Sequence, residues 1–152
     1  MIKLAIDLGS SVTKIYKIGS GIVLAEASCV AVASGTNMVK AIGEEAKQLI
    51  GKTAEYTTIV FPVFEADIVN EQMASVMLSY FLKKINIGKG QAKRTEVLFS
   101  VPCGCDNALL DKYYRLAEAC GIGLVHFVEV PFLSAFGQNL TLNESSPVFV
   151  VD

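Results

Sequence analysis

A polar glycine turn follows the first strand-like segment of the chain. Residues 2–8 and 14–18 are rich in β-branched and apolar side chains around this turn, which predicts a β-hairpin, with Asp7 at the end of its first strand. Gly9 lets the backbone come close to a ligand, and the N–H groups and hydroxyls of residues 10–12 can meet phosphate oxygens. Asp7 can hold Mg²⁺ through water, because Mg²⁺ keeps much of its hydration. A plain hairpin, in which Asp and Gly serve only the turn, is the alternative.

A second apolar strand with a carboxylate at its end closes the chain. Residues 148–151 are strongly strand-forming and lead directly into Asp152. Two strands that each deliver an Asp at the carboxyl end can hold one Mg-nucleotide between them, so Asp7 and Asp152 are the two candidate metal residues.

Other chemistries find little support in the composition. The cysteines at 29, 103, 105 and 120 lack metal-ligand spacing, and His126 and Ser100 have no partners that suggest covalent catalysis. A net charge of −2 without a basic stripe argues against nucleic acid as a partner. Because no apolar run approaches the roughly 18 residues of a membrane span, we expect a cytoplasmic chain with reduced cysteines.

The elements that must position these residues follow a clear pattern. Apolar residues at spacings of three and four predict helices over residues 71–85 and 106–120. Buried strands are expected at 96–101 and 122–128, and a further helix at 132–140 after Pro131. Helices that alternate with strands after an antiparallel opening predict an α/β fold with a mixed sheet. Residues 31–65 consist of short, turn-rich elements and are expected to form a small insert.

Several segments, in collinear order, resemble bacterial actins of the MreB type. Asp-Leu-Gly followed by Ser at residues 7–10 resembles the first phosphate loop of the actin, chaperone-ATPase and sugar-kinase superfamily. The further segments that resemble the MreB type are residues 21–28, 42–53, 77–84, 101–102 and 129–137. Each match is short, but together they span the whole chain.

The resemblance implies an actin-like ATPase lobe with a ribonuclease H-like mixed sheet. Residues 1–30 and 66–152 would form subdomain Ia, residues 31–65 an inserted subdomain Ib, and the second lobe would be absent from this sequence. The implied ligands are ATP and Mg²⁺, bound in the complete protein. The implied function is that of a cytoskeletal protein which forms filaments with ATP and determines cell shape. A non-filament ATPase-fold protein that uses nucleotide as a switch is the alternative, and a sugar-kinase relative ranks last.

The resemblance also assigns site residues. The phosphate and cofactor contacts would come from Asp7, Gly9, Ser10, Ser11, Val12, Lys14 and Asp152. Lys14 would steady a β-phosphate as a point charge, or it is an ordinary surface lysine. The water-positioning acid of the family lies directly before the Pro of a helix start, where this chain has Val130. Either a local shift brings the neighbouring Glu129 into the catalytic position, or hydrolysis is impaired.

Membrane contact is a further expectation from the family. The basic loop at residues 87–94 can touch anionic lipid electrostatically, at about 1 kcal/mol per basic residue, although it has no pair of apolar residues to insert. A solvated loop is the alternative, so peripheral contact with the inner membrane remains open beside self-association into filaments.

Overall fold

A mixed five-stranded sheet forms the centre of the larger part of the molecule. The computed structural model describes residues 1–52 and 56–138. The strand order is β10-β9-β1-β2-β3, with β1 parallel to β9, β9 parallel to β10, and antiparallel pairs elsewhere. The strands are β1 (Ile2–Leu8), β2 (Val12–Lys17), β3 (Gly21–Ala27), β9 (Thr95–Val101) and β10 (Leu124–Glu129). This sheet confirms the predicted α/β fold with a mixed sheet.

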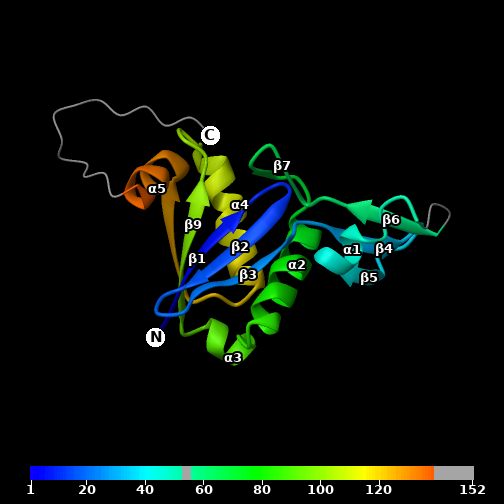
Figure 1. Cartoon of the computed structure of the whole chain (residues 1–152), viewed down its shortest axis with the longest axis horizontal. Helices are drawn as coiled ribbons and strands as arrows, with labels where there is room; N and C mark the ends of the chain where they lie inside the picture. The colour runs from blue at the N-terminus through cyan, green and yellow to red at the C-terminus, as the bar shows by residue number, and fades with distance from the viewer. Residues whose placement is uncertain (53–55, 139–152) are drawn as a thin grey trace.

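Two amphipathic helices pack on one face of this sheet and close the core (Figure 1). They are α2 (Glu71–Lys84) and α4 (Asn107–Ala119), close to their predicted ranges. Asn70 caps α2 by accepting a hydrogen bond from the Met73 N–H at 3.0 Å, and Asp106 caps α4 in the same way. The side chains buried between sheet and helices are mainly those of Ile6, Ile15, Phe99, Met77, Phe81 and Tyr113.

A smaller three-stranded sheet extends away from the large one (Figure 1). Its strands, in the order β5-β4-β6, are β5 (Val39–Ile42), β4 (Val30–Ala33) and β6 (Thr57–Val60), and the short helix α1 (Glu44–Lys47) packs beside them. It has its own small core of Ala27, Cys29, Ala31 and Ala46. The side chain of Glu26 joins the two parts, because it accepts a hydrogen bond from the Glu44 N–H at 2.9 Å and pairs with Lys84.

Three short elements depart from the sequence prediction. β7 (Val63–Phe64) and β8 (Asp67–Ile68) form a tight hairpin, and α3 (Lys89–Ala92) lies within the segment that was expected to be a loop. The last helix, α5 (Val130–Gly137), begins two residues earlier than predicted. The predicted strand at 148–152 lies outside the described residues.

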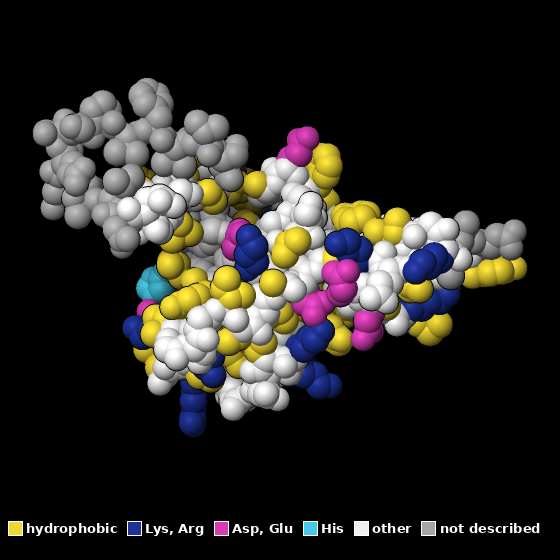
Figure 2. Space-filling model, in the orientation of Figure 1, with side chains coloured by type: hydrophobic (Ala, Val, Ile, Leu, Met, Phe, Trp, Pro, Cys, Tyr) yellow, Lys and Arg dark blue, Asp and Glu magenta, His cyan; other side chains and the backbone are white. Residues whose placement is uncertain are grey.

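The surface carries exposed apolar side chains on the β2–β3 hairpin (Figure 2). Tyr16, Ile18 and Ile22 are 46%, 65% and 66% exposed. Single exposed apolar residues are normal, but neighbouring ones can mark a contact surface. Among the described helices, none has the length and apolar character needed to cross a bilayer.

Candidate functional site

The glycine turn joins β1 to β2 at the edge of the sheet where the parallel strands end. Asp7 lies opposite Lys14 in the antiparallel register, at the carboxyl end of β1. A Cβ atom on Gly9 would lie 2.7 Å from the carbonyl oxygen of Val12, which no real side chain tolerates. The turn itself therefore requires glycine, whether or not a ligand approaches it.

Residues beyond the turn anchor it to the sheet. The Ser11 carbonyl accepts a hydrogen bond from the Ser28 N–H at 3.0 Å. The hydroxyls of Thr13 and Ser28 lie 2.8 Å apart and are buried, so each satisfies the other. These contacts hold the backbone of residues 10–12 in place beside β3.

The Asp7 carboxylate is exposed but held at one oxygen. The Ser100 hydroxyl, on the neighbouring strand β9, donates a hydrogen bond to Asp7 Oδ1 at 2.9 Å. Asp7 Oδ2 makes no hydrogen bond within residues 1–52 and 56–138, so it can accept from a water or a ligand. Lys14 is next to Asp7 across the hairpin, yet the two form no ion pair in the part of the chain that is described.

A hollow of about 440 Å³ opens directly beside this carboxylate. It lies where β1 and β9 end, and it is lined by residues 7–10 of the turn, residues 100–103, Ala66, Tyr113, and Val130 and Pro131 of α5. Ligands of α/β proteins bind in the crevice outside the carboxyl ends of the strands, so this is the position expected for a binding site. The hollow brings together Asp7, Gly9 and Ser10 of the residues proposed from the sequence.

Glu129 and Val130 have different surroundings. Glu129 ends β10, and its Oε1 accepts a hydrogen bond from the Gly104 N–H at 3.2 Å. The hydrogen bond and charge of Glu129 raise the pKa of the neighbouring Cys103 thiol above its ordinary value. Val130 begins α5 and lines the hollow. The Glu129 carboxylate contacts the loop at residues 103–104. A catalytic role for Glu129 stays a prediction.

Other proposed residues lie outside the hollow or outside the described chain. Ser11 and Val12 belong to the turn but do not line the hollow, and Val12 is 37% exposed. Lys14 lines a neighbouring depression that also includes Asp7 and Ser100. Asp152 falls outside the described residues, so the pairing of Asp7 with Asp152 around a metal stays a prediction.

The donor set agrees with a metal held mainly by water and ligand oxygens. Within the described residues no group of three His, Cys, Asp or Glu side chains is placed to hold a metal ion. Asp7 offers a single carboxylate with one free oxygen. This suits Mg²⁺, which is usually bound through one or two carboxylates and substrate phosphates, and it does not suit a site built from protein ligands alone.

The sequence analysis missed three residues of the hollow. Ser100, Tyr113 and Ala66 come from β9, α4 and the β7–β8 turn, and only the tertiary fold brings them to Asp7. Ala66 has a φ of 63°, in the left-handed region that usually requires glycine. Tyr113 lies on the buried face of α4, and helical periodicity carries no information about where its hydroxyl points.

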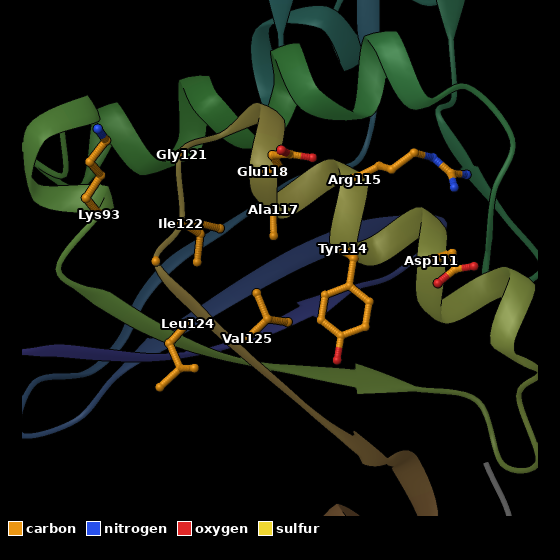
Figure 3. A pocket seen from close by; sticks show the side chains of 11 residues that line it. Lys93, Asp111, Tyr114, Arg115, Ala117, Glu118, Gly121, Ile122, Leu124 and Val125 are labelled. Carbon is orange, nitrogen blue, oxygen red and sulfur yellow. The ribbon is translucent and has the colours of Figure 1, made fainter.

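A larger hollow of about 950 Å³ lies elsewhere, between α4 and the edge strand β10 (Figure 3). Tyr114, Asp111 and Glu118 line it from α4, and Leu124 and Val125 line it from β10. It shares no residue with the hollow at the glycine turn. Because the smaller hollow lies at the carboxyl ends of the strands, beside Asp7 and the glycine turn, it is the better candidate.

Comparison with known proteins supports the likeness that the segments suggested. The family model described as MreB/Mbl protein matches residues 1–152. The chain is 32% identical over 153 residues to the cell shape-determining protein MreB of Escherichia coli K12, and 30% identical over 149 residues to Mbl of Bacillus subtilis. Both alignments cover 98% of this chain, which spans 44% of the length of either relative.

Solved structures show the same architecture. The crystal structures of MreB5 of Spiroplasma citri bound to ADP and to AMPPNP superpose with TM-scores of 0.81 and 0.82, at 25% identity. Each superposition covers 91% of this chain and 41% of the other. The predicted actin-like lobe is thereby confirmed as a fold, and both of those neighbours hold an adenine nucleotide.

Proposed function

Because the chain belongs to the MreB/Mbl family, we propose that it is the first nucleotide-binding lobe of a cell-shape cytoskeletal protein that forms filaments with ATP. The observation that carries the proposal is the hollow beside the glycine turn, with Asp7 and Ser10 on its wall. The nucleotide-bound states of the MreB5 structures support it. We propose the same subdomain division, with residues 1–30 and 66–152 as Ia and residues 31–65 as Ib.

The side chains of this lobe would hold and orient the phosphates. The N–H groups of residues 9–12 would meet phosphate oxygens, with Lys14 as a nearby positive charge. Asp7 Oδ2 would accept a hydrogen bond from a water on the metal, while Ser100 fixes the other carboxylate oxygen. When bound, Mg²⁺ neutralises the charge that develops on the transferred phosphoryl group. We propose that Asp152 contributes the second metal-facing carboxylate.

Hydrolysis would be weak in this arrangement. Val130 lines the hollow at the start of α5, and an isopropyl group can neither orient nor polarise a water. The Glu129 carboxylate is engaged by the Gly104 N–H. We therefore propose that nucleotide binding serves assembly, or a change of conformation, more than rapid turnover.

An NMR titration of the ¹⁵N-labelled chain with Mg-ATP tests nucleotide binding. We expect weak binding, because the chain spans 44% of the length of its MreB and Mbl relatives, with amide shifts concentrated in residues 7–12. Asp7→Asn should reduce the gain in affinity that Mg²⁺ provides. The matched control Asp111→Asn, a carboxylate of the larger hollow, should leave it unchanged. An absence of shifts at the turn up to high millimolar ATP would remove the nucleotide from the proposal.

Sedimentation separates the filament proposal from the alternative of a nucleotide switch. Protein that pellets with ATP and Mg²⁺, but not without them, supports filament formation. Protein that binds nucleotide and stays soluble under the same conditions favours the switch.

The same assay with liposomes that contain anionic lipid tests the proposed peripheral contact of residues 87–94 with the inner membrane.

A further inference from the structure

Tyr113 is a core residue that also reaches the candidate site. It lies on α4, is only 1% exposed, and its ring packs against Phe99 and Phe127 at centroid distances of 5.3 and 6.1 Å. The same side chain lines the hollow at the glycine turn, beside Asp7. The ring is therefore fixed by the core while part of the residue faces the site.

The side chain of Tyr113 is one of those that line the hollow. Burial, and then the charges of Asp7, Cys105 and Asp67, raise the pKa of Tyr113 to about 12. Asp7 lines the hollow, as does Ala66, which precedes Asp67 in the chain. The hydroxyl makes no hydrogen bond to any residue that the structure describes. A phenol hydroxyl without a partner among these residues is free to donate a hydrogen bond to a ligand in the hollow.

The phenol adds a donor on a rigid ring to a wall that already carries the Ser10 hydroxyl. Asp7 is an acceptor only, and Val130 and Pro131 contribute no side-chain donor. A phenol with a raised pKa stays protonated at physiological pH, so it remains a donor beside the carboxylate. A rigid donor on a packed aromatic ring also loses little conformational entropy when it binds.

We propose that the Tyr113 hydroxyl donates a hydrogen bond to an oxygen of a polyphosphate ligand held in the hollow at the glycine turn. The inference rests on the proposed function and adds a residue from α4 to a site otherwise built from β1, β9 and α5.

Removal of a single oxygen atom tests the proposal. Tyr113→Phe keeps the ring against Phe99 and Phe127, and Tyr114→Phe is the matched control on the same helix, 51% exposed and facing the larger hollow. The probes are Mg-ATP and inorganic pyrophosphate. Binding of each probe is measured from the initial slope of the amide shifts in the ¹⁵N-labelled chain. We expect roughly tenfold weaker binding for Tyr113→Phe, as for the loss of one hydrogen bond to a charged group, and no change for Tyr114→Phe.

Unfolding in urea without ligand gives an independent outcome. Because the hydroxyl has no partner among the described residues, its loss should leave the midpoint of Tyr113→Phe unchanged or raise it. A lower midpoint would mean that the hydroxyl has a structural partner, which would overturn the inference. Equal affinities of wild type and Tyr113→Phe would also overturn it and leave the proposed function standing. Absence of binding in the wild type would overturn both.

Discussion

Gly43 is a position where one added methyl group should destabilise the fold strongly. Its φ is +71°, and a Cβ there would lie 2.5 Å from Glu26 Oε2 and 3.1 Å from a ring carbon of Phe81. Phe81 is fully buried in the core, so it cannot retreat. Glu26 must therefore move, and it would lose its hydrogen bond from the Glu44 N–H and its pairing with Lys84.

The expected loss for Gly43→Ala follows from these contacts. The Gly43 backbone, with φ 71° and ψ −136°, lies in a region almost confined to glycine, and it costs another residue about 1–3 kcal/mol. Loss of a hydrogen bond to a charged carboxylate costs about 1.5–3 kcal/mol, while the pairing with the half-exposed Lys84 adds less than about 1 kcal/mol. We expect the free energy of unfolding to fall by about 3–4 kcal/mol, a large share of the roughly 5–15 kcal/mol of a typical domain.

Gly35→Ala is the matched control. Gly35 has a φ of +76°, but a Cβ there meets no atom within 4 Å, so only the backbone term of about 1 kcal/mol applies. Urea unfolding followed by far-UV circular dichroism measures both losses. Losses that agree within about 0.5 kcal/mol would refute the reasoning. In a Glu26→Ala background the cost of Gly43→Ala should drop toward that of Gly35→Ala.

Three further predictions concern titration and turnover. Burial opposes ionisation of Glu26, but hydrogen bonds from Lys84 and the Glu44 N–H outweigh it and lower the pKa below 4.5. The carboxylate therefore stabilises the fold above pH 4.5, and the stability gap between wild type and Glu26→Gln should close as the pH falls below that value. Glu129→Gln should lower the pKa of Cys103 and speed its alkylation at pH 7, as followed by mass spectrometry. Val130→Glu should raise the rate of phosphate release from ATP, and an unchanged rate would show that this position does not orient the water.

The long amphipathic elements could be predicted from the sequence because local pattern determines them. The apolar spacing predicted α2 to within one residue of its observed end, and the predicted start of the next helix at residue 106 coincides with the Asp106 cap of α4. In these helices the buried face and the capping residue lie in the same short segment, so no distant contact is needed to recognise them.

The helix α3 and the β7–β8 hairpin could not be predicted, because their stability comes from distant contacts. In α3, Ala92 is buried and its carbonyl accepts a hydrogen bond from the Gly123 N–H, 31 positions further along the chain. The β7–β8 turn places Glu65 and Ala66 at positive φ without the Asn-Gly signal of such turns. For the site, the sequence indicated the turn and the start of α5, whereas Ser100 and Tyr113 reach Asp7 only through the fold.

Gly9 and Asp7 of the glycine turn carry different information about function. Gly9 is required by the carbonyl of Val12, so the fold would need it even without a ligand. Asp7 takes no part in the turn hydrogen bonds of the described residues, and its carboxylate is exposed with one oxygen fixed by Ser100. An exposed carboxylate held in one orientation gives the fold little, because an exposed group gains little from such a contact. The functional argument therefore depends on Asp7 and its neighbours, and substitutions at Asp7, Ser100 and Tyr113 test binding more directly than any change at Gly9.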